Sequence, residues 1–174
     1  MKLTDRKWSP FLLKDIFRIE SGKRLEKENY VPGNTPFIGA SEINNGVTAF
    51  IGNQNVSMDQ NVLGVNYNGG VAISHYHAYE ALFSDDVKRF HLKHFPDNKY
   101  VFLFMKQVIL QQKVKFEYGY KFNAKRMDNT HIMLPVEDQG NPDYAFMESY
   151  MKELERRVLK KYTDYQTVNG GGKL

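Results

Sequence analysis

The chain has 174 residues with a formal net charge of +4, and 41% of its residues are hydrophobic and 25% charged. This composition suits one globular domain with a core of its own and excludes a disordered or fibrous chain. The absence of cysteine excludes disulfides, cysteine-ligated metal sites and a thiol nucleophile. Because there is neither an apolar run of the ~20 residues that a membrane span needs nor an apolar signal segment, we expect a cytoplasmic protein.

Short apolar segments separated by turn residues fill the first half of the chain and predict β-strands. They lie at 11–19, 36–39, 47–51, 61–66, 71–73, 81–83 and 87–92. Asn44-Asn45-Gly46 predicts a tight turn, because Asn-Gly readily adopts positive φ. Asn68-Gly69-Gly70 predicts a second turn of this kind. We therefore expect a twisted, mostly antiparallel sheet.

The composition changes after these strands. Residues 98–115 contain neither Gly nor Pro and carry apolar residues at helical spacing, with Asp97 or Asn98 as the cap. They predict a helix that packs against the sheet. The apolar run at 132–135 predicts a short strand that Pro135 ends.

The strongest local pattern is a long amphipathic helix near the C-terminus. Asn141 suits the cap, Pro142 the first helical position and Asp143 the positive end of the helix dipole. Its apolar stripe comprises Tyr144, Met147, Met151, Leu154, Val158, Tyr162 and Tyr165. We expect part of this stripe to contact another chain, although a helix that lies wholly across its own domain would show the same pattern.

These patterns predict an α+β domain at 1–140, a long helix at 141–165 and a flexible tail at 166–174 that contains three consecutive glycines.

The positive charge is concentrated before the helix. Between Asp85 and Arg126 there are ten Lys/Arg and four Asp/Glu residues, a net charge of +6, with aromatic residues interleaved. A basic, aromatic segment suits nucleic-acid binding, and a solvated helix face beside a core is the alternative.

Catalytic motifs are weak. A nuclease with a Pro-Asp element followed by Asp/Glu-x-Lys is not supported, because Asp86-Val87-Lys88 precedes Pro96-Asp97. His75 and His77 would share one face of a strand and could join Glu80 in a metal site, but ordinary polar strand positions explain them better. We therefore expect neither a catalytic residue nor a metal site.

An ordered set of landmarks resembles one family: the target recognition domains of specificity subunits in type I restriction–modification systems and related type IIB and IIG enzymes. The landmarks are Trp8-x-x-Phe-x-Leu13, Asp15-Ile-Phe17, Ile19-x-Ser-Gly-Lys23, Pro36-Phe-Ile-Gly-Ala-Ser41, Asn44-Asn-Gly-Val47 and Ile132-x-Leu-Pro135 before a long helix. The set runs from Trp8 to Tyr165, nearly the whole chain.

The resemblance implies a non-catalytic subunit that reads one half of a split sequence in double-stranded DNA. It implies two protein partners, an adenine-N6 methyltransferase (M) subunit and a restriction (R) subunit. It also implies no cofactor for this chain, because S-adenosylmethionine belongs to the methyltransferase. A full specificity subunit has two recognition domains joined by antiparallel helices. One domain and one helix therefore resemble a half-subunit, a truncated chain or the product of a split gene. The apolar stripe would then pair with the helix of a second copy or of a missing half, and a symmetric dimer would read an inverted repeat.

Base edges are read by Arg, Lys, Asn and Gln, and phosphates by cations and backbone amides. Such groups in the irregular segments predict DNA contacts at Lys23, Arg24, Ser41, Asn44, Asn45, Asn66, Asn68, Tyr118, Tyr120, Lys121, Lys125 and Arg126. Turn chemistry alone could explain the asparagines, and ordinary surface charge could explain Lys23 and Arg24.

Three other functions remain open. A recognition module from a fused methyltransferase–nuclease would look nearly identical. An RNA- or single-strand-binding protein would also explain the basic, aromatic segment. A hydrolase that uses His75, His77 and Glu80 would require a bound metal.

Overall fold

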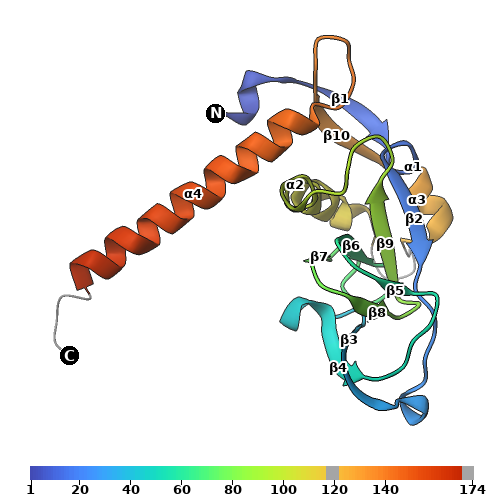
Figure 1. The fold of residues 1–174 in the computed structure, drawn as a ribbon. Coiled ribbons are helices and arrows are strands. Elements are labelled where there is room, and N and C mark those ends of the chain that lie inside the picture. The colour runs from blue at the N-terminus through green and yellow to red at the C-terminus, as the bar shows by residue number, and fades with distance from the viewer. Residues whose placement is uncertain (117–121, 170–174) are drawn as a thin grey trace.

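The computed structural model describes residues 1–116 and 122–169. The strands are β1 (Lys7–Leu12), β2 (Phe17–Ser21), β3 (Pro32–Ile38), β4 (Val47–Ile51), β5 (Met58–Asp59), β6 (Val62–Asn66), β7 (Ser74–His77), β8 (Ala81–Phe83), β9 (Val87–Leu92) and β10 (His131–Val136). The α-helices are α1 (Leu13–Ile16), α2 (Lys99–Leu110), α3 (Ala124–Asp128) and α4 (Tyr144–Asn169), and a 3-10 turn, η4 (Gln111–Lys115), extends α2. These elements form a rounded α+β domain from which α4 projects (Figure 1).

A central antiparallel sheet has the strand order β2-β9-β6-β7. Helix α2 packs against it, and the main core between them includes Phe17, Leu63, Phe90 and Phe102, each no more than 1% exposed. Helix α2 begins as predicted, because the Asn98 side chain accepts hydrogen bonds from the backbone N–H groups of residues 100 and 101.

A second four-stranded sheet has the order β4-β3-β8-β5. The sequence pattern predicted one sheet, whereas the described strands form two four-stranded sheets and a separate β1–β10 ribbon. Among these strands β3 and β8 form a parallel pair and the other pairs are antiparallel, so the expected mostly antiparallel α+β class is confirmed.

A layer of charged side chains joins the two sheets. Asp59 on β5 accepts hydrogen bonds from Arg89 (2.9 Å) and from the His91 ring (2.9 Å), both on β9. Asp97 contacts the other ring nitrogen of His91 at 2.7 Å, and Arg89 also forms an ion pair with Glu20. These hydrogen bonds raise the pKa of His91, with Asp59 the larger contributor, and burial opposes them.

The β1–β10 ribbon brings the N-terminal segment beside the start of α4 (Figure 1). Pro135 does not end the strand as predicted. It lies opposite Trp8 within the ribbon, and β10 continues to Val136. Proline is tolerated here because an edge strand leaves some N–H positions unpaired.

Helix α4 begins later and ends later than predicted. Asp143, rather than Asn141, provides the cap, because its Oδ1 accepts a hydrogen bond from the backbone N–H of Phe146 (2.8 Å). Arg6 binds the other Asp143 oxygen at 2.7 Å and fixes this start. The helix continues to Asn169, so residues 166–169, predicted as tail, are helical. No helix in the described ranges is long and apolar enough to cross a membrane.

Candidate nucleic-acid interface

Several loops leave the central sheet at the same end. Ser21 at the end of β2 lies opposite Lys88 at the start of β9. On the neighbouring strand, Asn66 at the end of β6 lies opposite Val87. The segments after β2, between β6 and β7, and before β9 therefore meet at one edge of the sheet, which we call the loop edge.

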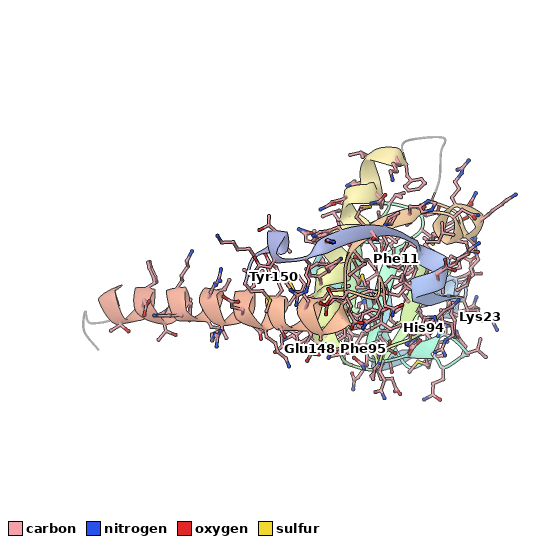
Figure 2. All side chains as sticks on the ribbon, turned by 90° about the horizontal axis from the view of Figure 1, so that it is seen from above. Phe11, Lys23, His94, Phe95, Glu148 and Tyr150 are labelled. Carbon is pink, nitrogen blue, oxygen red and sulfur yellow. The ribbon has the colours of Figure 1, made fainter. Side chains whose placement is uncertain are left out.

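The segment after β2 approaches the loop before β9 very closely. A Cβ atom at Gly22 would lie 2.0 Å from the carbonyl oxygen of Ser84, so only glycine fits. The backbone N–H of Lys23 then donates to the carbonyl of Phe83 at 3.0 Å. Both predicted contacts here are exposed; Lys23 lies on the side of the domain away from α4 (Figure 2), and Arg24 forms an ion pair with Glu26 (2.6 Å).

Residues 41–46 form a second loop at this edge, the 41–46 loop. Asn44, Asn45 and Gly46 have φ angles of 51°, 53° and 77°, which agrees with the predicted positive-φ turn. The carbonyl oxygen of Ser41 accepts hydrogen bonds from His75 Nε2 (3.0 Å) and Asn66 Nδ2 (3.4 Å). The start of the loop is thus attached to two strands of the central sheet.

Asn66 is 1% exposed. The prediction that it contacts DNA is therefore wrong, because its amide faces the 41–46 loop. The Ser41 hydroxyl likewise bonds within the loop, where it donates to the Ile43 carbonyl at 3.2 Å. Asn44 and Asn45 remain exposed.

The end of the 41–46 loop is attached to the segment after β7. Asn45 Nδ2 donates to the Tyr79 hydroxyl at 2.9 Å and lies 3.4 Å from the Tyr76 carbonyl oxygen. The same hydroxyl lies 3.2 Å from His77 Nδ1. Burial, with smaller effects of His75 and Lys106, lowers the pKa of His77 to about 4, so its ring is neutral at physiological pH.

The loop between β6 and β7 carries Asn68, whose Nδ2 donates to Asp86 at 2.6 Å. Lys88, which the sequence patterns do not predict as a DNA contact, lies against Tyr67 of the same loop. Its ammonium donates to the Ser21 hydroxyl at 2.8 Å and lies 4.7 Å from the centre of the Tyr67 ring. Burial lowers the pKa of Lys88. Nothing in the local pattern distinguishes this lysine from an exposed strand residue, because its contacts with Ser21 and Tyr67 join three separate segments of the chain.

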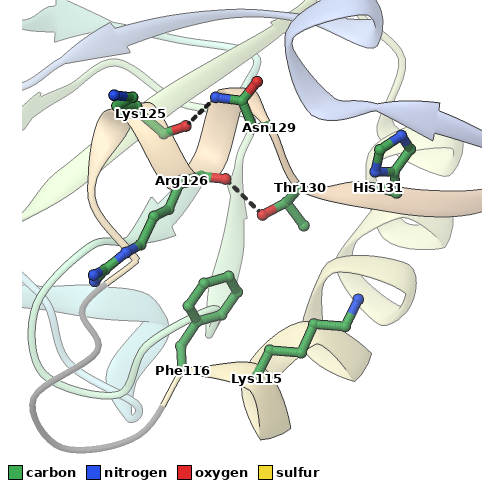
Figure 3. Close-up of a pocket in the computed structure, with 7 residues that line it drawn as sticks. All are labelled: Lys115, Phe116, Lys125, Arg126, Asn129, Thr130 and His131. Atoms are coloured by element: carbon green, nitrogen blue, oxygen red, sulfur yellow. Dashed lines mark hydrogen bonds between the residues drawn. The ribbon is translucent and has the colours of Figure 1, made fainter.

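A basic pocket of about 530 Å³ lies between the end of η4, α3 and the start of β10. It is lined by Lys115, Phe116, Lys125, Arg126, Asn129, Thr130 and His131, with Phe116 central in the view of Figure 3. Two of the predicted DNA contacts, Lys125 and Arg126, lie here with Lys115, which the sequence patterns do not predict as a contact. η4 links this pocket to the 41–46 loop, because its Lys113 lies 3.7 Å from Glu42.

The remaining predicted residues divide into three groups. Tyr118, Tyr120 and Lys121 lie outside the described residues. The start of the α4 stripe belongs to the domain's own core, because Tyr144 and Met147 are 8% and 0% exposed. The prediction that these two residues contact a partner helix is therefore wrong.

The rest of the stripe leaves the domain (Figure 2). Met151 is half-buried against the core, whereas the residues beyond it are exposed: Leu154 (41%), Val158 (59%), Tyr162 (62%) and Tyr165 (64%). The alternative in which the whole helix lies across its own domain is thereby excluded.

The metal-dependent hydrolase is not supported. His75 and His77 lie on the same face of β7 with ring centres 6.5 Å apart, but His75 binds the Ser41 carbonyl and Glu80 is exposed. In the part of the chain that the structure describes, no three His, Asp or Glu side chains lie close enough together to hold a metal ion.

The chain can now be compared with known proteins of similar sequence and fold. Residues 5–162 match the family model of the type I restriction modification DNA specificity domain. The chain is 57% identical over 162 residues to S.BcgI, described as the specificity subunit of a type II restriction enzyme from Heyndrickxia coagulans. That alignment covers 93% of this chain and 48% of the relative, so the chain spans about half the length of the curated relative it matches.

Solved structures share the fold at low sequence identity. The S subunit of a type I restriction–modification system from M. genitalium has a TM-score of 0.59 at 15% identity, covering 95% of this chain and 44% of that one. The HsdS subunit from Thermoanaerobacter tengcongensis has a TM-score of 0.59 at 12% identity, covering 88% and 38%. A structure described for complex assembly of the type I system has a TM-score of 0.65 at 13% identity, covering 92% and 41%.

Proposed function

Because the chain belongs to the family of type I restriction modification DNA specificity domains, we propose that it recognises a specific double-stranded DNA sequence for a restriction–modification complex. The observation that carries this proposal is the family match, which spans residues 5–162 and thus both sheets, α2 and most of α4.

The geometry supports two kinds of DNA contact. The 41–46 loop presents Asn44 and Asn45, which suit base edges. The basic pocket presents Lys115, Lys125 and Arg126, which suit phosphates but do not discriminate sequence.

In this proposal the chain recognises DNA and catalyses no reaction. A partner methyltransferase subunit holds S-adenosylmethionine and methylates adenine at N6, and cleavage belongs to the complex. The 57% identical relative is named as part of a type II restriction enzyme, whereas the type I structures are 12–15% identical. The more similar relative therefore supports a type II arrangement, which the sequence landmarks allowed beside type I.

The test is to map DNA methylation by the cognate methyltransferase subunit with and without this chain. We expect methylation at one defined sequence only when the chain is present. A methyltransferase that modifies the same sequence alone, or a chain that itself transfers methyl groups, would contradict the proposal. Selection of bound duplexes from a random library by the chain provides an independent readout.

We further propose that the exposed end of the α4 stripe pairs with the same helix of a second copy. Val158 and Tyr162 lie one turn apart, and their exposed fractions are 59% and 62%. An apolar stripe that continues beyond its own domain resembles the seam of a helix pair. A symmetric dimer would present two recognition domains, which matches the roughly double length of the curated relative.

Replacing Val158 and Tyr162 by Asp is expected to weaken the dimer by on the order of 100-fold, because buried unpaired carboxylates cost several kcal/mol. Light scattering across a concentration series measures this change. The matched control replaces Thr163 and Thr167, which lie on the opposite side of the helix, by Asp, so that it adds the same charge. An unaltered chain that is monomeric at every concentration would exclude the pairing.

A further inference from the structure

The 41–46 loop is held at both ends by the segment from β7 to Tyr79. His75 binds the carbonyl of Ser41 at the start of the loop, and Tyr79 binds the amide of Asn45 near its end. Because β7 is a strand of the central sheet, the loop has a fixed position on the scaffold. A loop attached in this way can present one side chain in a defined orientation.

The orientation of the Asn45 amide follows from its neighbours. The Tyr76 carbonyl oxygen only accepts hydrogen bonds, so the amide group that faces it is the NH₂ and not the oxygen. The Tyr79 hydroxyl lies 2.9 Å from the same nitrogen. Among the described residues nothing donates to Asn45 Oδ1, and the residue is exposed.

Tyr79 is fixed in turn by His77. The Tyr79 hydroxyl, which accepts from Asn45, also lies 3.2 Å from His77 Nδ1, and the direction of the hydrogen bond between them depends on the His77 tautomer. The neutral His77 ring can accept this hydrogen bond. It packs edge-on against Phe83, with ring centres 5.1 Å apart, and lies over Gly64, where an added Cβ would lie 3.0 Å from Nε2. The chain Asn45, Tyr79, His77 thus ends in the packed interior.

We propose that Asn45 Oδ1 accepts a hydrogen bond from an exocyclic amino group of a DNA base in the major groove, and that Tyr79 is the positioning residue for this contact. The inference rests on the proposed DNA recognition and names the group that is read. Asn usually contacts adenine with both its oxygen and its nitrogen. Here the nitrogen is already used, so the contact selects amino-bearing adenine or cytosine against the keto edges of guanine and thymine.

The experiment begins with the full chain and a random duplex library, from which the preferred sequence is selected. Each adenine in it is then replaced by purine, and each cytosine by 2-pyrimidinone, so that one exocyclic amino group is removed at a time. At one position we expect the unaltered chain to lose about 10-fold in affinity, the size of a single base-edge hydrogen bond.

Asn45→Gly removes the amide without backbone strain, because the φ of 53° suits glycine. This variant is expected to bind the natural site about 10-fold more weakly, and to bind the amino-free site no more weakly than the natural one. Asn44→Gly is the matched control at a φ of 51°, and should keep the amino preference at that position. Tyr79→Phe should reduce the preference while the affinity for a random duplex at low salt stays unchanged.

Two failures are distinguishable. If no sequence is enriched from the library, the proposed function fails and this inference fails with it. If a sequence is enriched but Asn45→Gly retains the full penalty at every amino-free position, only the assignment of Asn45 is overturned. A preference for guanine or thymine at the position that Asn45→Gly relaxes would also overturn it.

Discussion

Replacing Lys115, Lys125 and Arg126 together by Gln is expected to weaken duplex binding by on the order of 100-fold at low salt and to lower the salt slope by about three. The three cations line one pocket of about 530 Å³, and a phosphate there would release condensed counterions. The losses should be equal for specific and random duplexes, because phosphate contacts carry no sequence information. Titration of labelled duplexes across a salt series measures both quantities.

The matched control removes three positive charges elsewhere. Arg156, Lys160 and Lys161 are exposed on α4 and lie away from the residues that line the basic pocket. Their replacement by Gln gives the chain the same net charge as the variant of the basic pocket, and we expect the salt slope to change by less than one. Equal losses in the two triple variants would show that general charge, rather than the basic pocket, governs binding.

The features that the sequence predicted well are those that short segments decide. Asn98 caps α2 as expected, and Asn44-Asn45-Gly46 adopts the positive φ angles that this tripeptide favours. The cap of α4 differs because two residues on either side of Pro142, Asn141 and Asp143, both suit it. The ion pair with Arg6, 137 residues away in the sequence, favours Asp143, and no local pattern contains that information.

The roles of individual polar side chains were less predictable. Asn66 and Asn45 have the same side chain beside turn residues, yet Asn66 is buried and supports the loop while Asn45 is exposed. Burial depends on which strands become neighbours, and single-segment patterns do not specify this. Similarly, helical periodicity is the same where α4 covers its own domain, at Met147, and where it leaves it, at Val158.

Replacing Asp59 by Asn is expected to lower the free energy of unfolding by about 3 kcal/mol, because it removes one of two carboxylates from each of two buried cations, Arg89 and His91. Asp59 joins β5 of one sheet to β9 of the other. The exposed fractions of its partners' side chains are 6% for Arg89 and 9% for His91, so water replaces the lost charge poorly. Urea unfolding at constant m value measures the change.

Asp164→Asn on the exposed part of α4 is the control, and it should change the free energy of unfolding by less than about 0.5 kcal/mol. A similar small change for Asp59→Asn would show that the two sheets hold together without the charged layer. The loss is expected in the unfolding free energy even if DNA binding at low temperature is unchanged, because the layer lies between the sheets.

The pH dependence of the effect of Asp59→Asn on the free energy of unfolding tests the contribution of His91. Its pKa is raised above 6.5 in the folded state, so its stabilisation is complete below 6.5 and is lost as the pH rises through the folded pKa. Asp59→Asn removes the main cause of that shift. The difference in unfolding free energy between the variant and the unaltered chain should therefore be larger at pH 6 than at pH 8.

Other titrating groups do not reproduce this trend. Burial opposes ionisation of Asp59, but the hydrogen bond and charge of His91 outweigh it and the pKa of Asp59 is lowered, so its own contribution is lost only on the acid side of 3.8. His77, with a pKa of about 4, destabilises the folded chain as the pH falls below 6.5, in the variant and the unaltered chain alike. The effect of His77 therefore cancels when the unfolding free energies of the variant and the unaltered chain are subtracted. A penalty that grows from pH 6 to pH 8 would therefore exclude a charged His91 in the layer between the sheets.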